Sequence, residues 1–340
     1  MRSSLRTMRV LIYIYVINSC MKICQTGPCK FDVRCQCRKA KNRYVEVNCS
    51  SKKITRIPNL LESTVLLNVS HNLIDSISKE LLKAANHLLV LDLSFNRLSS
   101  INITTFTGLM KLRYLSLDNN KLEYNDHIFP EGIFKPLKSL SHLSLKNNNY
   151  YSMHPDRNFP DKTISDLSEL ETLELDVTGK YFGEGFDKLL NLKSLILGNR
   201  DFFSMSNTTF SNTRNLQNIV LHGIEKVKFR KGSFRKLRYL KHLEISFNSK
   251  LGGMISPVED IAEDFKFTSI ETLKLGQTSI SLPKFPLCIL NNELYTTNIT
   301  EIYITDHRRK AGHFPVSIGP TPPTLRIFGF IEQWSHSIYN

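Results

Sequence analysis

A pattern of eleven residues occurs twice between Leu88 and Leu122, and it restricts the folds open to this chain more than any other feature. The four leucines and the asparagine of the first copy return 24 residues later as Leu112, Leu115, Leu117, Asn120 and Leu122. Self-similarity at a fixed period indicates a stacked array, in which each unit contacts only its neighbours and the chain grows in one dimension. We therefore expect one elongated domain.

The spacing L-x-x-L-x-L-x-x-N-x-L is the signature of a leucine-rich repeat. Its fourth position can be marked ten times along the chain, at Leu67, Leu91, Leu115, Leu143, Leu173, Leu195, Ile219, Leu243, Leu273 and Ile302. Leu325, Phe328 and Phe330 look like the start of an eleventh copy. Positions 4 and 6 should point inward and positions 5 and 7 outward, so that stacked copies form a parallel sheet.

Bulky apolar residues also precede the leucine runs, among them Phe106, Phe134, Phe186, Phe210 and Phe234. Segments that carry them are thicker than strands, so the stack must curve. The sequence therefore predicts an α/β leucine-rich repeat solenoid, a curved horseshoe with a parallel β-sheet on its concave face. The asparagine at position 9 is expected to bond backbone groups left unpaired where the chain turns out of each strand.

Three segments are expected along the chain: a signal peptide over residues 1–24, a cysteine cap over 25–58 and the repeat array over 59–340. Arg2, Arg6 and Arg9 precede a short apolar run, which is typical of a secretory signal and too short to span a bilayer. No later run reaches spanning length, and no C-terminal cysteine cap is present. We expect a fragment, a truncated gene model or a short isoform.

Four cysteines cluster after the predicted signal, at Cys29, Cys35, Cys37 and Cys49. An even cluster in a secreted chain predicts two disulfides, and the spacing leaves three connectivities open. Zinc is the alternative, but zinc prefers a C-x-x-C or Cys/His pattern. The array needs such a cap, because its first repeat would otherwise expose an apolar face.

Charge and glycosylation motifs suggest an extracellular surface. The formal net charge of +14 favours acidic partners, and eight cations lie between Lys226 and Lys241. That cluster could hold phosphate or sulfate groups, but charge runs usually only solvate a face, and we favour the solvated face. Five N-x-S/T motifs predict glycosylation at Asn48, Asn68, Asn102, Asn207 and Asn298. A glycan on Asn68 would obstruct the concave sheet there, so we expect ligand contact farther along.

Outward strand positions of the middle repeats supply the candidate ligand-binding residues, namely His142, Lys146, Glu174, Asp176, His222, Lys241 and His242. A concave sheet of mixed charge suits recognition of a protein or glycolipid better than a small-molecule pocket. The alternative is that strand faces need polar residues in any case. No metalloprotease, phosphate-loop, hydrolase or dinucleotide motif is complete, so we expect no enzyme, no cofactor and no metal.

The cap VNCSSKKITRIP and the repeat TVLLNVSHNLIDSI, together with the uneven later repeats, resemble the N-terminal half of a Toll-like receptor ectodomain. The resemblance implies pairing of Cys29 with Cys37 and of Cys35 with Cys49. It also implies a single-pass receptor of innate immunity that binds a microbial or endogenous protein, glycolipid or polyanion and forms homo- or heterodimers. Nucleic acid is possible as a ligand but not indicated, and membrane contact would come only from a segment after residue 340. The alternative is a secreted or matrix repeat protein, or a decoy, for glycan or protein ligands.

Overall fold

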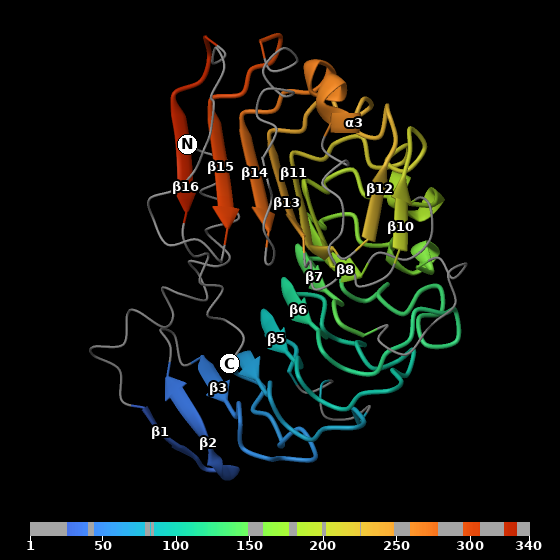
Figure 1. Ribbon diagram of the computed structural model, residues 1–340. Helices are drawn as coiled ribbons and strands as arrows, with labels where there is room; N and C mark the ends of the chain where they lie inside the picture. Colours follow the sequence, from blue (N-terminus) through green and yellow to red (C-terminus); the bar gives the residue numbers. More distant parts are fainter. Residues whose placement is uncertain are drawn as a thin grey trace.

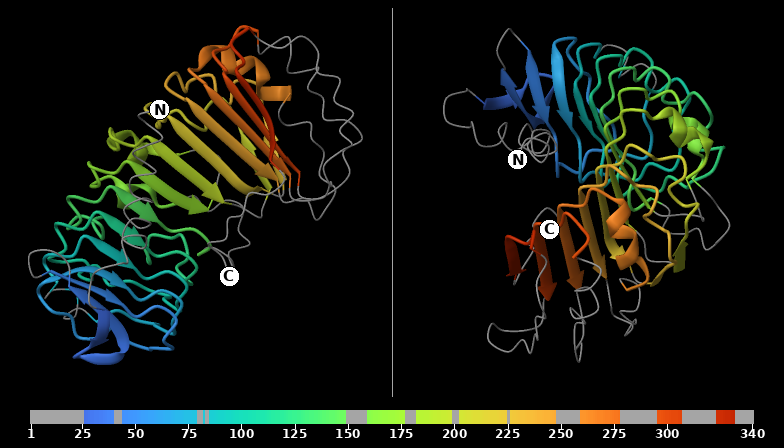
Figure 2. Two further views of the ribbon diagram at one scale, coloured as in Figure 1. Left: turned by 90° about the vertical axis from the view of Figure 1, so that its left-hand side faces the viewer. Right: turned by 90° about the horizontal axis from the view of Figure 1, so that it is seen from above.

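The computed structural model describes residues 26–39, 44–78, 82, 85–148, 159–176, 182–198, 202–224, 226–247, 259–277, 295–306 and 323–331. The predicted signal peptide lies outside these residues. The described chain forms an arc whose inner side is lined by one sheet (Figure 1). Two further views show the strands stacked side by side along the arc (Figure 2).

This 14-stranded sheet has the order β1-β2-β3-β4-β5-β6-β7-β8-β9-β11-β13-β14-β15-β16. From β3 onward every neighbouring pair is parallel. The repeat strands are β4 (Thr64–Asn68), β5 (Val90–Asp92), β6 (Tyr114–Ser116), β7 (His142–Ser144), β8 (Thr172–Asp176), β9 (Ser194–Gly198), β11 (Asn218–Ile224), β13 (His242–Phe247), β14 (Thr272–Gln277), β15 (Glu301–Asp306) and β16 (Ile327–Ile331).

The register of these strands matches the repeat template. Each template leucine or isoleucine, from Leu67 through to Ile302, pairs with its counterpart on the next strand. Ile302 then pairs with Phe328, so the expected eleventh copy begins where the sequence placed it. The side chains at the marked position from Leu67 to Ile302 are buried, as the inward-facing prediction requires.

Phenylalanines fill the side of the core away from the sheet. Phe106 and Phe134 lie with ring centroids 5.8 Å apart, and Phe210 and Phe234 with centroids 5.6 Å apart. This outer layer contains the short strands β10 (Phe202–Met205) and β12 (Lys226–Phe229), which pair in parallel (Figure 1). It also contains the single turns η2 (Asp161–Ile164), η3 (Glu184–Lys188), α3 (Glu259–Ala262) and η5 (Glu263–Phe267). The sheet therefore lies on the concave side of the arc and this outer layer on the convex side, as predicted (Figure 1).

The N-terminal cap consists of β1 (Thr26–Cys29), β2 (Asp32–Lys39) and β3 (Val45–Asn48). β2 pairs antiparallel with both neighbours, and β3 pairs in parallel with β4, which joins the cap to the array. Disulfides link Cys29 to Cys37 and Cys35 to Cys49, the pairing that the resemblance implied. Val47 is fully buried against the first repeat, so the cap shields the apolar end of the solenoid.

A ladder of buried asparagines holds the turns that follow β4, β5, β6 and β7. Asn96 is typical: its Nδ2 donates to the carbonyls of Val69, Leu93 and Ser94, and its Oδ1 accepts from the Ile74 amide. Asn72, Asn120 and Asn148 make equivalent bonds. Each amide therefore ties its own repeat to the one before it. The residue before each asparagine has a positive φ of 52–56°, namely His71, Phe95, Asn119 and Asn147.

Replacing Asn96 with Ala should lower the free energy of unfolding by about 1–3 kcal/mol, because the buried Ile74 amide would lose its partner and the carbonyls of Val69, Leu93 and Ser94 would each lose one of two donors. Urea unfolding followed by circular dichroism measures this change. Asn86→Ala is the control, since Asn86 is exposed and should cost less than about 0.5 kcal/mol. Similar losses in the two variants would contradict the structural role of the ladder.

Candidate functional site

The inner face of the sheet between β7 and β15 carries the candidate site, which we call the central strip. Strand register sets its rows: one row runs Glu174, Ile196, Val220, Glu244, Lys274, with each residue paired to the next. All five side chains are partly exposed. Alternation along each strand buries their sequence neighbours, so the outward residues form a continuous surface.

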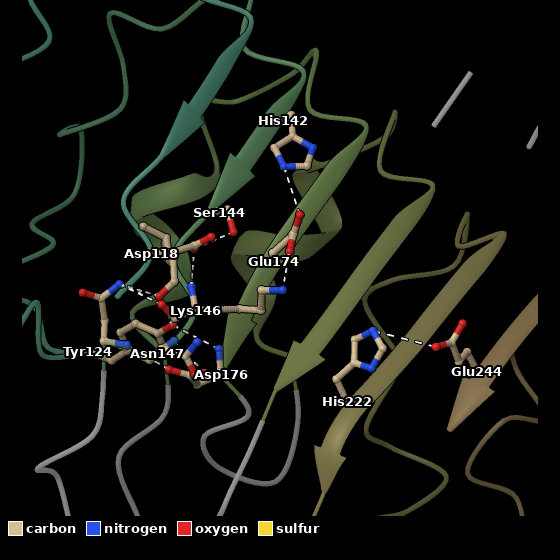
Figure 3. A network of polar contacts seen from close by, with 12 residues as sticks. Asp118, Tyr124, His142, Ser144, Lys146, Asn147, Glu174, Asp176, His222 and Glu244 are labelled. Carbon is tan, nitrogen blue, oxygen red and sulfur yellow. Dashed lines mark hydrogen bonds and ion pairs between the residues drawn. The ribbon is translucent and has the colours of Figure 1, made fainter. Parts of the chain in front are cut away.

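The first charge cluster of the strip is centred on Glu174 in β8 (Figure 3). The Oε1 atom of Glu174 lies 3.1 Å from His142 Nε2, and its Oε2 atom lies 2.6 Å from Lys146 Nζ. Burial opposes ionisation of Glu174, but the His142 hydrogen bond and the Lys146 charge outweigh it and lower the pKa to about 2. His142 also stacks on Tyr114, with ring centroids 4.6 Å apart. The cluster is therefore fixed in position before any ligand arrives.

Asp118 is buried next to this cluster, and its carboxylate bonds the backbone of Lys146. Its Oδ1 atom accepts bonds from Ser144 Oγ at 2.5 Å and from the Lys146 amide at 2.8 Å. Burial raises the pKa of Asp118 to about 7, helped by the nearby charge of Glu174. The carboxyl therefore gains or loses its proton close to neutral pH, which changes the charge of this end of the strip.

Beyond Asn148, the last residue of the asparagine ladder, Asp176 and Tyr124 form the hydrogen bonds to the backbone. The carboxylate of Asp176 accepts from the amides of Asn147 and Asn148 at 3.0 and 3.2 Å. Tyr124 accepts from the Asp176 amide through its hydroxyl oxygen and donates to the Leu145 carbonyl. Asp176 thus has a structural role in addition to the ligand-binding role predicted for it (Figure 3).

The second charge cluster lies on β11, β13 and β14. His222 Nε2 is 3.8 Å from Glu244 Oε1, and Lys274 Nζ is 4.0 Å from Glu244 Oε2. His222 Nδ1 also lies 3.0 Å from Ser246 Oγ, and the Lys274 amine lies 5.8 Å from the Tyr303 ring centroid. Burial raises the pKa of Glu244 and lowers that of Lys274, so each is shifted toward its neutral form. Figure 3 places His222 and Glu244 apart from the Glu174 cluster.

An apolar gap separates the two clusters. Ile196 and Val220 occupy the row between Glu174 and Glu244, and Gly198 lies beside Asp176 in the adjoining row. Both apolar side chains are partly exposed. The predicted ligand-binding residues were all charged or aromatic, so Ile196 and Val220 were not among them, although the same register would have identified both. Lys274 and Tyr303 were missed for a different reason, because the predicted positions came from the middle repeats and ended at His242.

The other predicted ligand-binding residues lie at the edge of the strip. Lys241 precedes β13 and pairs with Glu271 at 2.8 Å. His242 begins β13, and burial lowers its pKa. The structure therefore brings together His142, Lys146 and Glu174, while His222, Lys241 and His242 do not join that group.

The five predicted glycosylation sites all fall on described residues. Asn48, Asn102, Asn207 and Asn298 are exposed, and Asn68 is partly exposed. Asn48 and Asn68 pair across β3 and β4, so both stand on the inner face near the cap. Glycans at these positions remain a prediction.

The described residues contain no group of histidine, cysteine and acidic side chains suited to a metal ion. Among the same residues, no helix is long and apolar enough to cross a membrane. What the strip offers chemically is a small apolar surface with ionisable side chains on both sides of it. That arrangement suits contact with another macromolecule, in which an apolar group is buried and polar groups surround it.

Comparisons with known proteins agree with the fold. The leucine-rich repeat family model matches residues 63–122. The chain is 27% identical over 262 residues to Toll-like receptor 2 type-1 of Gallus gallus, a match that covers 76% of this chain and 29% of the receptor. It is 27% identical over 210 residues to Tsukushi of Gallus gallus, covering 59% of this chain and 53% of Tsukushi. A crystal structure of the mouse RP105/MD-1 complex matches with a TM-score of 0.60 and 21% identity, covering 80% of this chain and 43% of that chain.

The chain therefore has the leucine-rich repeat fold. Among proteins with this fold, it is similar to the ectodomains of Toll-like receptors, as the residues of its cap and first repeats indicated. It spans less than a third of the length of the Toll-like receptor 2 type-1 that it matches.

Replacing Glu174 with Gln should lower the pKa of Asp118 from its value of about 7, because the charge of Glu174 raises it. The pKa should stay above 3.8, because burial is the larger cause. A pH titration of the Asp118 carboxyl carbon by NMR measures the midpoint. Glu171→Gln is the control, since Glu171 pairs with Lys193 and is not among the groups that shift the pKa of Asp118, so it should leave the midpoint unchanged.

The raised pKa of Asp118 also predicts how the free energy of unfolding changes with pH. The pKa of Asp118 is raised on folding, so its stabilising contribution is fully present below about pH 3.8 and is lost as the pH rises to about 7. In Asp118→Asn this loss should disappear. A variant whose stability falls with pH over that range as steeply as the unaltered protein would contradict the assignment.

Proposed function

We propose that this chain is the extracellular ligand-recognition part of a Toll-like pattern-recognition receptor in innate immune signalling. It binds a microbial or endogenous ligand at the central strip and acts as a receptor homo- or heterodimer. The observation that carries the proposal is the apolar gap of Ile196 and Val220 between the Glu174 cluster and the Glu244 cluster. No catalytic step is part of it.

The glycosylation pattern supports this location of the ligand site. Predicted glycans on Asn48 and Asn68 would cover the inner face next to the cap. The inner face from β7 to β15 carries no predicted acceptor on an outward strand position, because Asn207 and Asn298 lie outside the strands. The strip is thus left open to a large partner.

A second candidate function is that of a secreted repeat protein that binds glycan or protein ligands, or acts as a decoy. The match to Tsukushi favours it, because this chain spans more of Tsukushi than of the Toll-like receptors. Sequencing the transcript beyond the codon for Asn340 separates the two candidates. A spanning helix and a TIR domain would support the receptor, and a cysteine cap followed by a stop codon would support the secreted protein.

A reporter assay tests the proposed receptor function directly. The chain is fused to the membrane and TIR segments of a Toll-like receptor, and cells that express it are exposed to purified lipopeptide, lipopolysaccharide and flagellin. We expect at least one of these molecules to activate the reporter. Absence of any response would count against the microbial ligand.

Replacing Val220 with Arg should raise the half-maximal ligand concentration at least tenfold, because a charged side chain would fill the apolar gap. Val90→Arg is the matched control, since Val90 is a partly exposed valine on the inner face at β5, outside the strip. Both variants must reach the cell surface in equal amounts. An equal effect of the two changes would place recognition elsewhere.

A further inference from the structure

A group of exposed cations lies in the outer segments next to β11, β13 and β14. We call it the basic patch and define it as Arg214, Arg235, Lys236, Arg238 and Lys266. Arg214 and Arg238 each stand two residues before a buried leucine, Leu216 and Leu240, so they occupy the same position in successive repeats. The patch therefore extends across three neighbouring repeats instead of along one loop.

Uncharged groups hold these cations in place. Lys236 Nζ donates to Ser211 Oγ at 3.1 Å, and Arg214 Nε donates to the Ser211 carbonyl at 3.3 Å. Ser211 thus accepts hydrogen bonds from two cations that belong to different repeats. Like charges gathered in this way repel one another, and a bound anion relieves that repulsion.

The second pair of cations lies around Phe267, whose side chain is exposed. The Arg235 guanidinium lies 4.0 Å from the ring centroid, and Lys266 Nζ lies 5.4 Å from it. Arginine stacked in this way keeps its donor groups at the edge of the ring, where they can reach an anion. Phe267 thus positions charge on the surface.

Two carboxylates lie near the patch, Glu263 and Asp264; the charge of Arg235 acts on both, but their hydrogen bonds and ion pairs go to groups outside the patch. Glu263 forms an ion pair with Lys231, which stands outside the patch. Asp264 is buried and accepts bonds from the amides of Gly232 and Phe234. The patch therefore keeps a positive charge despite its acidic neighbours.

We propose that the basic patch binds a sulfated polysaccharide through several sulfate groups at once. Sulfates spaced along a sugar chain match cations spaced over several repeats, and each contact releases counterions. The disulfides of the cap indicate an oxidising, extracellular setting, where sulfated polysaccharides are among the polyanions that a protein meets. This site lies outside the sheet and is independent of the ligand proposed for the central strip.

A nucleic acid is the competing polyanion, and the structure favours it less. Single strands bind through aromatic rings on which bases stack. Arg235 already covers the Phe267 ring. Tyr239 is 59% exposed beside the patch and could contact either a sugar or a base. An RNA probe is therefore included in the test.

The test measures binding of the full chain to immobilised heparin at about 0.15 M salt. The double change Arg235→Glu with Arg238→Glu should weaken binding roughly tenfold or more and make its salt dependence shallower. The matched control is Lys135→Glu with Lys138→Glu. These exposed lysines stand at the same distances before Leu140 as Arg235 and Arg238 do before Leu240, and they change the net charge equally. The control should stay within about twofold of the unaltered chain.

Arg235 contacts Phe267, so a second variant, Arg214→Gln with Arg238→Gln, leaves that contact intact and should also weaken binding. Thermal unfolding verifies that each variant is folded. Equal losses in the patch and control variants would show that net charge alone binds heparin and would overturn the proposal. Undiminished binding to desulfated heparin, or tighter binding to single-stranded RNA than to heparin, would overturn it as well.

Discussion

Every turn of this solenoid faces the same constraint: backbone groups that leave a strand must find hydrogen-bond partners inside a dry core. The asparagine ladder meets that constraint after β4, β5, β6 and β7, because each amide reaches carbonyls of two successive repeats. Stacking and turning thus depend on the same side chain. Leucine burial supplies the driving force, but it is the asparagine that fixes how one repeat is placed on the next.

The place where the ladder ends is also where the candidate site begins. After Asn148, Tyr124 and Asp176 bond the backbone of the neighbouring repeats in place of a further asparagine. Strands lengthen from three residues in β7 to five in β8, which widens the inner face. The regular repeats near the cap therefore establish the register, and the less regular ones carry the charges and the apolar gap.

Much of the fold could be predicted from the sequence, because the repeat has a fixed period and each leucine of the template has one possible partner on the next strand. The register from Leu67 to Ile302 followed directly. The disulfide pairing needed the resemblance to a family, since spacing alone left three connectivities.

The site was predicted only in part. The sequence identified His142, Lys146 and Glu174 as outward residues, but not that they meet, and it could not show that Asp176 bonds the backbone. Ile196 and Val220 were missed because an apolar residue in a strand pattern suggests core, and only the register places them outward.

The parallel register also fixes the distances between side chains on the inner face. Neighbouring strands lie about 4.8 Å apart, so the three steps from Glu174 on β8 to Glu244 on β13 span about 14 Å. An extended peptide advances about 3.3 Å per residue, and roughly four residues would bridge that distance. A partner that contacts both charge clusters must therefore present complementary groups at that separation. Molecules shorter than this can engage only one end of the strip.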